Sequence, residues 1–562
     1  MSVTIENKFA KLLSVGAALT TILVIAGPVS DPVNVTKLLS LGIFSFALLP
    51  FFVYLGKSTL VKKNPIPTYL SVLFAAASIS ALIFSEAPLV QNLYGVVGRN
   101  TGLVTLLLFL IIFLVSSNFT NLESIRFIVL SLLVAGGINV IYGFVNQYIG
   151  DPFPWTNIYG AFLGTFGNPN FAGAFLGLVV GACLALALAS LRNPKYLLFY
   201  GTLFTASGIV VLFTKTTQGI LVSGLTAGIV VLIYIYKSVS KSIFSYMSLA
   251  VFVFTGFIVI LGILQKGPLA QYLYKRSVSL RGVYWDTAIQ VGNSHPFTGV
   301  GLDTFGDWYR TERSLKAATW LPGPETISNS AHNLYLDMYA NGGLPLLITY
   351  TSFTVLGIWN IIRILKRING FDPYAAILIS VFIGFQAQSL ISIAQIGIAL
   401  WGWLIIGALH SYARIISSVN ENATAKLKKI KKLNPDSPVG VFMFVSAAIG
   451  LLLTLPPYSA DAKYTNATKS QALDRVESTF KPSYFNPQFS QRIAMAAYLL
   501  EQNNFGDLAH KYALQGVKFN SHSYEAWKLL YILRNSTPAD RELALSKMRE
   551  LDPLNPNLEK LK

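Results

Sequence analysis

The sequence predicts an all-α protein with about thirteen membrane-spanning helices and a smaller helical domain behind them. Three observations lead to this fold class. Of the 562 residues, 53% are hydrophobic and only 12% are charged, and the mean hydropathy is +0.54. Apolar runs of about twenty residues, enough to cross a bilayer, follow one another over residues 1–455. The composition becomes that of an ordinary soluble protein in residues 456–562, which we call the tail.

Each predicted membrane helix corresponds to one apolar run. The first run, Lys8 to Val29, has features of a signal peptide, but it is long, has no convincing cleavage site and is followed at once by another run. We therefore expect it to remain in the protein as a helix. The runs lie near 8–27, 36–56, 66–85, 101–117, 123–148, 170–190, 196–214, 218–236, 243–264, 333–362, 373–391, 395–413 and 438–455.

The basic residues predict which ends of these helices face the cytoplasm. Lys and Arg gather in alternate connections, and short cytoplasmic loops are enriched in both. The extracytoplasmic side then holds the 86–100 loop, the 149–169 loop, the 265–332 loop (the outer loop) and the tail, so polar segments of several connections can meet there. The residues that set this orientation are Lys57, Lys62, Lys63, Arg192, Lys195, Lys237, Lys241, Arg363, Lys366, Arg367, Arg414, Lys426, Lys428, Lys429, Lys431 and Lys432.

The tail has the spacing of small and apolar residues that is typical of a tetratricopeptide-like helical repeat. Two units, displaced by roughly 34 residues, are too few for an independent solenoid, because each repeat needs neighbours to bury its apolar face. The tail therefore either binds a protein partner or packs as a cap on the membrane domain. The first unit contains Ala497, Leu500, Ala509, Ala513 and Gly516, and the second extends from Ala526 to Pro556.

The composition argues against several other classes of function. The net charge of +18 would suit nucleic acid, but the basic residues serve topology in short connections, so we expect no nucleic-acid partner. The single cysteine, Cys183, lies in an apolar run, which leaves no internal disulfide and no cysteine-based metal site. The five histidines form no recognisable ligand cluster. We expect neither a metal nor another cofactor.

Arg281 and Trp285 are the most informative residues of the outer loop. They lie at i and i+4, so a helix here places both side chains on one face. Fixed Arg side chains next to a bilayer suit the binding of an anionic, lipid-linked substrate, because they stabilise developing negative charge. Arg276 and Arg99 are the next candidates. The alternative is that each Arg extends to lipid headgroups while Trp285 belongs to the aromatic belt.

His332 stands between the outer loop and the next apolar run. Imidazole titrates near neutral pH, so His332 can accept the proton of an acceptor hydroxyl as a general base. The alternative is an interfacial or capping residue, since Ser330 and Asn333 can cap the helix that follows.

Asn168 and Asn170 flank a proline at the start of the sixth run. Their amides can bind sugar hydroxyls or phosphate. An Asn-Pro-Asn sequence is equally typical of a plain turn with a helix cap, and both interpretations stay open.

Five motifs follow one another between residues 90 and 360. They are LYGVVGRNTG (93–102), GTFGNPNFAGAFL (164–176), TKTTQG (214–219), the RGVYW…HPFTGVGLDTF segment that begins at Arg281, and HNLYLDMYANGG, which begins at His332. Their order resembles the O-antigen ligase and polymerase superfamily of bacterial cell-surface glycan assembly. The resemblance implies an integral-membrane glycosyltransferase of the GT-C kind, whose donor is a polyprenyl-diphosphate-linked glycan on the outer side of the cytoplasmic membrane.

The residues at the last motif match the ligase pattern of this superfamily. That pattern is a His, then Asn, Ser or Gln, and a Gly after nine further residues, and it is met by His332, Asn333 and Gly343. The resemblance implies that His332 acts in catalysis and that Asn333 contacts substrate. Leu346 departs from the small or polar residue expected three positions later.

The chain also departs from the superfamily at the start of the eighth run. The Ser-Arg-Gly turn that is common there is Thr217-Gln218-Gly219 here, so one expected cation is missing. Lys215 can replace it as a point charge, although a Lys lacks the planar fork that suits a diphosphate.

We therefore expect a glycosyltransferase of the cytoplasmic membrane that transfers a glycan to a lipid or protein acceptor. A polymerase of the same superfamily needs the same binding of the donor, and the match at His332 and Asn333 favours the ligase. A secondary transporter would place ionisable residues near the membrane midplane in matching halves, whereas here the charge gathers in one outer loop. A scaffold that displays the tail would leave the Arg and His residues unused.

Overall fold

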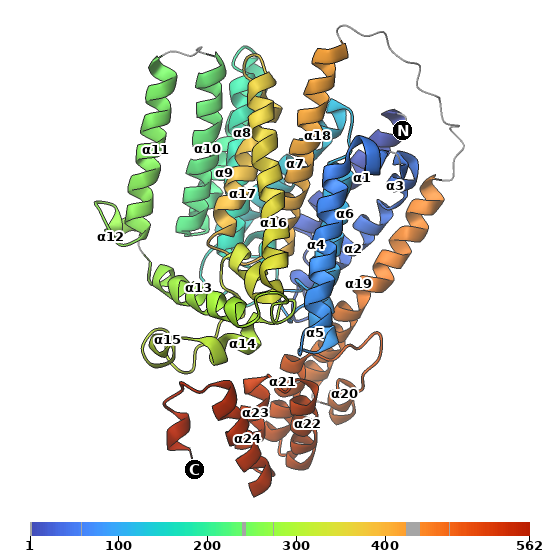
Figure 1. The fold of residues 1–562 in the computed structure, drawn as a ribbon, viewed down its shortest axis with the longest axis vertical. Helices are drawn as coiled ribbons and strands as arrows, with labels where there is room; N and C mark the ends of the chain where they lie inside the picture. The colour runs from blue at the N-terminus through green and yellow to red at the C-terminus, as the bar shows by residue number, and fades with distance from the viewer. Residues whose placement is uncertain are drawn as a thin grey trace.

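A computed structural model describes residues 3–57, 59–238, 243–273, 275–422, 439–470 and 472–561. In these residues the protein is all-α, and the one β-type pairing is an isolated bridge between Ser483 and Asn486. Long helices form an upright bundle, and shorter helices, including those of the tail, gather at one end of it (Figure 1). Lys241 and the Lys426–Lys432 segment, which the topology prediction used, lie outside the described residues.

Each of the predicted apolar runs coincides with a helix of the bundle. Among the described residues, ten helices are long and apolar enough to cross a membrane, two shorter apolar helices (α6 and α17) accompany them, and α1 covers the first run. The predicted all-α, multi-pass membrane fold is therefore confirmed. The bundle contains α1 (Val3–Ile22), α2 (Asn34–Ala47), α3 (Pro50–Leu55), α4 (Pro65–Ile83), α6 (Leu103–Ser116), α7 (Leu122–Tyr148), α8 (Pro169–Ala189), α9 (Pro194–Phe213), α10 (Thr217–Ser238), α11 (Ile243–Ile263), α16 (Leu334–Arg367), α17 (Pro373–Ser389), α18 (Ile396–Asn422) and α19 (Val439–Ser470).

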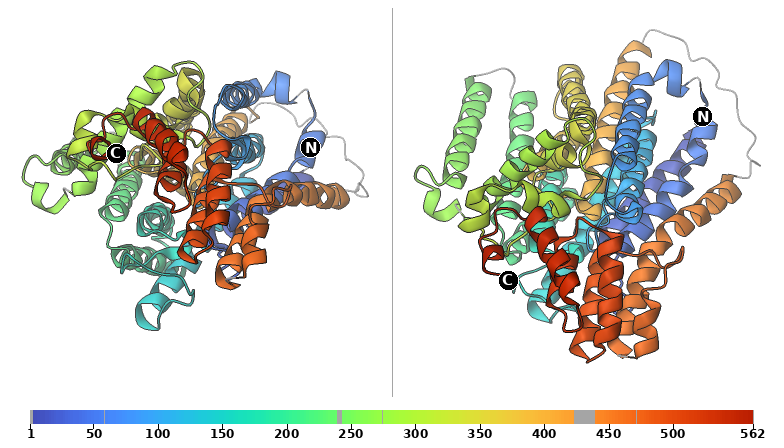
Figure 2. Two further views of the ribbon diagram at one scale, coloured as in Figure 1. Left: turned by 90° about the horizontal axis from the view of Figure 1, so that it is seen from below. Right: turned by 60° about the horizontal axis from the view of Figure 1, so that its bottom comes forward.

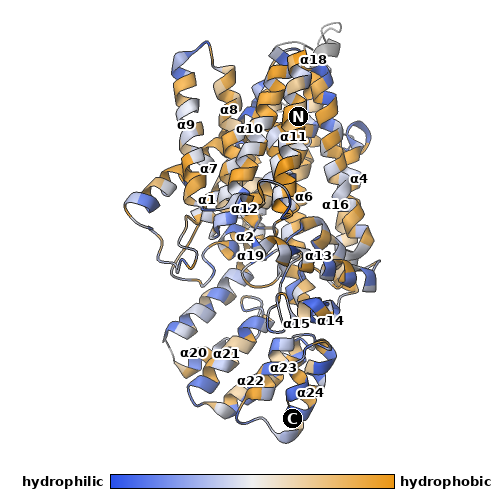
Figure 3. Ribbon diagram, turned by 90° about the vertical axis from the view of Figure 1, so that its left-hand side faces the viewer, coloured by the Kyte–Doolittle hydropathy of each residue, from blue (hydrophilic) through white to orange (hydrophobic). Residues whose placement is uncertain are grey.

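The helices differ in how much of their apolar surface meets other helices. α8 and α18 are enclosed within the bundle, whereas α11 is almost wholly exposed along its apolar length. Lipid tails are as apolar as these side chains, so an exposed apolar helix is stable when it faces the bilayer. Close packing inside uses aromatic side chains such as Trp403, whose ring lies 4.9 Å from that of Phe353. The bundle therefore has a protein core and a lipid-facing surface, and the mostly hydrophobic bundle contrasts with a mixed tail (Figure 3).

Most of the short helices and polar loops lie at one end of the bundle. Contacts between distant segments bring several connections together at this end: Lys215 donates to the carbonyl of Gly160 at 2.7 Å, and His522 of the tail lies 3.4 Å from Glu86. Seen from below, the tail covers part of this end (Figure 2). The short elements at this end are α5 (Leu89–Tyr94), η2 (Gly164–Phe166), α12 (Ala270–Leu273), α13 (Arg276–Ser294), α14 (Phe305–Glu312) and α15 (Leu315–Thr319), and η1 (Thr59–Lys63) joins α3 to α4.

α19 continues from the bundle into the tail through the proline pair at 456–457. A proline has no N–H, so the carbonyls four residues earlier, those of Leu452 and Leu453, lose their helical donors. Tyrosine hydroxyls replace both donors. Tyr484 of the tail donates to the Leu452 carbonyl at 2.9 Å, and Tyr94 at the end of α5 donates to the Leu453 carbonyl at 3.1 Å. The helix can therefore pass two prolines without leaving either of these carbonyls unpaired.

The tail has its own apolar core. Two helical hairpins build it, and the aromatic rings of Phe480 and Tyr512 stack at its edge. The C-terminal helical region expected from the sequence is therefore present, while its repeat character stays a prediction. The tail contains α20 (Leu473–Ser478), α21 (Ser490–Gln502), α22 (Gly506–Phe519), α23 (Tyr524–Ile532), α24 (Pro538–Leu551) and η3 (Leu558–Lys560).

A buried ion cluster fastens the tail to the outer loop. Asp552, which is fully buried, accepts two hydrogen bonds from Arg313 of the outer loop at 2.7 and 2.8 Å and one from Arg310 of α14 at 3.0 Å. Glu525 of α23 pairs with Arg310 as well, at 3.0 Å. Removing one partner of a buried cluster leaves an uncompensated charge and is strongly destabilising. The tail and the outer loop are therefore held together by buried charges of opposite sign, and each is costly to bury without its partner.

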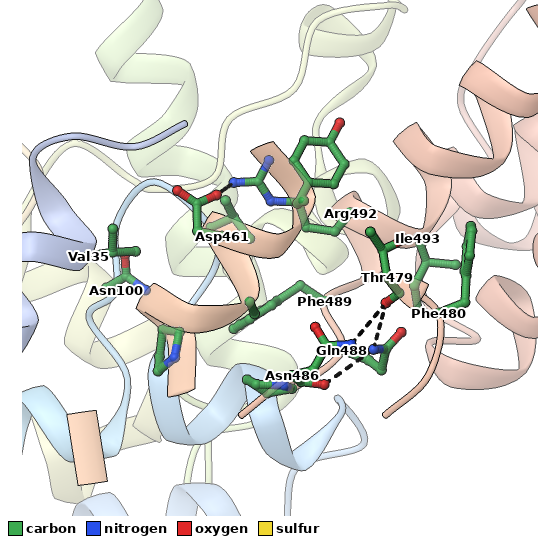
Figure 4. A pocket seen from close by; sticks show the side chains of 15 residues that line it. Val35, Asn100, Asp461, Thr479, Phe480, Asn486, Gln488, Phe489, Arg492 and Ile493 are labelled. Carbon is green, nitrogen blue, oxygen red and sulfur yellow. Dashed lines mark hydrogen bonds and ion pairs between the residues drawn. The ribbon is translucent and has the colours of Figure 1, made fainter. Parts of the chain in front are cut away.

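A second junction lies between α19, α21 and the loop before α2. Asp461 of α19 accepts hydrogen bonds from the hydroxyl and backbone N–H of Ser30, at 2.7 and 2.9 Å, and forms an ion pair with Arg492 of α21. Figure 4 shows Asp461 and Arg492 pointing toward each other beside a small cavity of about 20 Å³. Burial lowers the pKa of Arg492 to about 10, so it stays charged at neutral pH.

Candidate active site

α16 is broken nine residues after it begins. Gly343 has φ 64 and Pro345 follows it, so the carbonyls of Ala340 and Asn341 cannot be satisfied along the helix. The turn after α13 supplies the missing donors: the N–H groups of Val300 and Gly301 donate to these two carbonyls at 3.0 and 3.1 Å. The HPFTGVG turn therefore stabilises the break in α16 through these two backbone hydrogen bonds.

Glycine is required where the HPFTGVG turn contacts the break in α16. Gly299 has φ 62, and a Cβ on it would lie 2.2 Å from the backbone nitrogen of Gly342. A Cβ on Gly343 would lie 2.6 Å from the carbonyl oxygen of Pro296. Both distances are too short for any side chain, so this close backbone contact explains the glycines of both motifs.

His332 lies immediately before the N-cap of α16 in a left-handed conformation, with φ 54. Its backbone N–H donates to the Ser330 hydroxyl at 3.1 Å, and that hydroxyl donates to buried Asp337 at 2.6 Å. Asp337 also accepts from the N–H of Ala331 at 2.8 Å. A non-glycine residue at positive φ persists only where its surroundings fix it, and here the Asp337 carboxylate fixes the segment that holds His332.

The imidazole of His332 stacks on Tyr284 of α13, with ring centroids 5.6 Å apart. Within the described part of the chain, no group hydrogen-bonds either ring nitrogen. The ring is therefore held by packing while both nitrogens stay available for chemistry.

α13 presents Arg281 and Trp285 one helical turn apart, as the i, i+4 spacing predicts. Neither side chain has a hydrogen-bond or ion-pair partner among the described residues, and the indole Nε1 of Trp285 is buried without an acceptor. Burial lowers the pKa of Arg281, yet a guanidinium remains protonated at neutral pH. Two unpaired N–H donors on one face suit a ligand that is rich in acceptor oxygens.

Arg99 differs from Arg281 because its charge is compensated. Its guanidinium lies 3.2 Å from buried Asp303 and donates to the carbonyl of Asn329. Asp303 also accepts from the backbone N–H of Val96 at 2.9 Å and from the hydroxyl of Thr101 at 3.0 Å. Arg99 therefore joins the 95–101 loop to the outer loop next to His332.

The surroundings of His332 lower the pKa of its imidazole. Burial, together with the positive charges of Arg281 and Arg99, lowers the pKa of His332 to about 4. His332 is therefore neutral at physiological pH in the free protein. The structure thus brings together His332, Arg281 and Arg99, three residues that the sequence selected from two separate loops.

The other predicted residues lie at the same end of the bundle but are engaged elsewhere. The Nζ of Lys215 is bound to the carbonyl of Gly160. Asn168 caps α8 by accepting from the backbone N–H of Asn170 at 2.9 Å, and Asn333 caps α16 by accepting from two backbone N–H groups at 3.0 and 3.2 Å. The side chain of Arg276 lies outside the described part of the structure.

Sequence reasoning assigned no role to three residues that shape the site. Asp337 positions the His332 segment, Asp303 neutralises Arg99, and Tyr284 supports the imidazole. A carboxylate within an apolar run is itself a signal, because buried charges in membrane helices are costly unless they have a role. Asp337 carries that signal; Asp303 and Tyr284 lie in polar sequence, where nothing distinguishes them from ordinary loop residues.

The fold and the site together define a multi-pass membrane protein with a cationic, histidine-containing site at one end of its helical bundle. Residues 201–351 match the sequence model of the O-antigen ligase family. This stretch of the chain is therefore similar to that family, and the rest of the chain lies outside the match. The matched stretch includes Arg281, Trp285 and His332 and ends before the tail. Comparison with curated proteins finds no match.

Proposed function

We propose that this protein is a metal-independent glycosyltransferase that moves a glycan from a polyprenyl-diphosphate donor to a lipid or protein acceptor. One observation carries the proposal. Arg281, which has no counter-ion among the described residues, lies three residues before Tyr284 on α13, and the ring of Tyr284 stacks on the imidazole of His332 at 5.6 Å. An unpaired cation and an available base are the two groups that transfer from a diphosphate requires.

The proposed reaction is a direct displacement at the anomeric carbon of the donor. The acceptor hydroxyl oxygen forms a bond to that carbon, and the bond from the carbon to the phosphate oxygen breaks, with its electron pair leaving on the diphosphate. His332 takes the proton of the hydroxyl. Arg281 stabilises the charge that develops on the leaving group, which a fixed guanidinium does without reorganisation. Trp285 offers a further N–H to the diphosphate oxygens.

Donor binding would also activate His332. A pKa of about 4 makes the free imidazole a weak base at neutral pH. Part of this depression comes from Arg281 and Arg99, whose positive charges oppose protonation. A diphosphate bound at Arg281 brings negative charge to the same place and raises the pKa of His332 toward neutrality. The base thus becomes effective only when the donor is present.

We assign the remaining predicted residues to substrate contacts around this centre. Arg276 would add positive charge for the diphosphate, while Arg99, paired with Asp303, would contact the donor only through N–H groups that its partners leave free. Lys215, Asn168 and Asn170 would contact the glycan, while Asn333 orients the start of α16 toward the acceptor.

Activity assays in vesicles test the proposal. The purified protein is reconstituted with a polyprenyl-diphosphate glycan and candidate lipid or protein acceptors, and products are identified by mass spectrometry. Arg281→Ala should reduce both donor binding and turnover severely, and Arg281→Lys should reduce them less, because Lys keeps the charge but loses bidentate geometry. His332→Ala should abolish transfer while donor binding persists. Lys316→Ala, which removes an exposed cation of the same outer loop, serves as the matched control.

The outcomes separate the possible roles. Normal turnover in a stably folded Arg281→Ala protein would contradict the assignment of the diphosphate site. If His332→Gln keeps near-normal turnover, His332 orients the acceptor and is not its base. Formation of a lengthened lipid-linked glycan instead of a conjugate with a separate acceptor would identify a polymerase.

We further propose that the site faces the outside of the cytoplasmic membrane. The Lys and Arg residues of the opposite loops support this orientation. A periplasm-active reporter fused after Lys562 should be active. Activity of a cytoplasm-only reporter at the same position would contradict it.

A further inference from the structure

A turn of the tail reaches back to the membrane-spanning part of the protein. Residues 481–485, the sequence Lys-Pro-Ser-Tyr-Phe, are all exposed, and the bridge from Ser483 to Asn486 closes the turn. We call residues 481–485 the aromatic turn. The hydroxyl of Tyr484 donates to the carbonyl of Leu452 on α19 at 2.9 Å, which fixes the turn against that helix.

The contact places the aromatic turn at a defined depth. Leu452, on α19, lies three residues before the end of the apolar run 438–455. A helix rises about 1.5 Å per residue, so the contact lies roughly 5 Å inside the end of the apolar segment. Neighbouring side chains of α19 face outward, since Leu452 is 50% exposed and Ile449 is 47% exposed. In a membrane, lipid covers this surface of α19.

The composition of the aromatic turn fits the boundary between hydrocarbon and water. Tyr484 and Phe485 are 55% and 41% exposed and pack edge to face, with centroids 5.0 Å apart. Amphipathic aromatic rings are enriched at the headgroup level of bilayers. Lys481, at the start of the turn, adds a positive charge of the kind that attracts anionic headgroups.

We propose that the aromatic turn inserts into the interfacial layer of the bilayer and binds lipid headgroups there. We identify the binding partner as lipid because the exposed rings adjoin the lipid-facing surface of α19 and no described protein segment covers them. The tail is then held by the membrane at this turn as well as by the buried ion cluster at Asp552. The proposal does not depend on the glycosyltransferase assignment.

Site-directed spin labelling tests the insertion. The only native cysteine, Cys183, is fully buried, so a nitroxide reagent should modify an introduced exposed cysteine selectively. Phe485→Cys and, as a second site in the same turn, Ser483→Cys are labelled in the full-length protein. Leu543→Cys on α24, where the native side chain is 52% exposed, is the matched control in the tail. Each protein is reconstituted into vesicles of phosphatidylethanolamine and phosphatidylglycerol, and collisions with oxygen and with a water-soluble nickel chelate are measured.

Lipid insertion predicts that the labels in the aromatic turn collide more with oxygen, which concentrates in the bilayer, than with the nickel chelate. The label at 543 should show the reverse order. If the labels at 483, 485 and 543 all collide more with the nickel chelate than with oxygen, as labels in water do, the proposal is overturned. Strong immobilisation with low access to both reagents would overturn it too, because it would show a protein partner or a second copy of the chain in place of lipid.

Discussion

At the scale of single residues, the coupling between Arg281 and His332 is the property most open to measurement. The positive charge of Arg281 is one cause of the depressed pKa of His332. Replacing it with a neutral side chain of similar size should therefore raise that pKa above about 4. His332 would then lose its proton at a higher pH than in the native protein.

The pH dependence of carbethoxylation measures this shift, because diethylpyrocarbonate modifies neutral imidazole. Modification of the peptide that contains His332 is followed by mass spectrometry in Arg281→Gln and in native protein. The midpoint should move to higher pH in the variant. Lys316→Gln, the exposed cation of the same loop, should leave the midpoint in place. An unchanged midpoint in Arg281→Gln would show that the two groups are electrostatically independent.

Asp337 should affect the rate of transfer while sparing the affinity for the donor. Asp337→Asn removes the charge that binds Ser330 and the N–H of Ala331, so the His332 segment is held less firmly. Misplacing a reacting group by about 1 Å can cost roughly 100-fold in rate. We expect kcat to fall roughly tenfold to 100-fold with the KM for the donor nearly unchanged.

Steady-state kinetics with the vesicle assay check this expectation. Asp286→Asn, which changes an exposed carboxylate of α13, is the control and should behave like the native protein. Asp337→Glu should recover part of kcat. A rise in KM with an unchanged kcat would place Asp337 in donor binding instead of His332 positioning.

At the scale of elements, α19 shows how tertiary contacts override a local helix-breaking signal. The proline pair at 456–457 normally predicts the end of a helix, and the sequence alone gives no reason to continue it. The hydroxyls of Tyr94 and Tyr484 supply donors from two other segments. α19 extends to Ser470 as a result and carries the bundle into the tail.

These contacts predict a dependence between Tyr484 and Pro456. Tyr484→Phe removes the donor to the Leu452 carbonyl and should cost about 1 kcal/mol in the native background. In a Pro456→Ala background the new alanine N–H can bond that carbonyl, so the same change should cost much less. The thermal midpoints of the four proteins in detergent give the coupling.

The control for this cycle is Tyr498→Phe on α21, an exposed tyrosine of the tail. It should have the same small effect in both backgrounds. If Tyr484→Phe lowers the midpoint equally with and without Pro456, the hydroxyl does not replace the lost helical donor.

At the scale of the whole molecule, the buried ion cluster joins the tail to the outer loop that carries the candidate site. Asp552→Asn would leave Arg310 and Arg313 without their buried carboxylate, and breaking a buried pair costs about 3–5 kcal/mol. We expect a marked drop in the thermal midpoint and in transfer. Glu550→Gln, which removes an exposed pair with Lys547 on the same helix, should change neither, since exposed pairs contribute about 0–1 kcal/mol.

A variant in which the cluster carries less buried charge complements the Asp552→Asn measurement. Replacing Arg313 and Asp552 together by apolar residues should restore much of the stability lost in Asp552→Asn, because no charge is then left buried alone. Failure of the double variant to recover would show that the cluster is not the main tie between the tail and the outer loop.

The sequence predicted the bundle well because apolar runs of membrane length are strong signals. It also selected Arg281, Arg99 and His332, since charged and titratable residues beside a bilayer are rarely placed without a role. It could not predict the partners of these residues. Nothing in the chain near Arg99 indicates Asp303, and nothing near Arg313 indicates Asp552. Such pairs depend on how distant segments fold together, which a single sequence does not display.

The two sides of the ion cluster are synthesised at different times. Asp552 follows Arg313 by 239 residues, so the ribosome makes the outer loop well before the carboxylate that neutralises it. Until the tail has been translated and folded, Arg310 and Arg313 lack the partner that buries them and the loop around the site stays incompletely packed. A shortened chain that ends before Asp552 would therefore be an unfinished protein, recognisable to proteases, instead of a smaller working one.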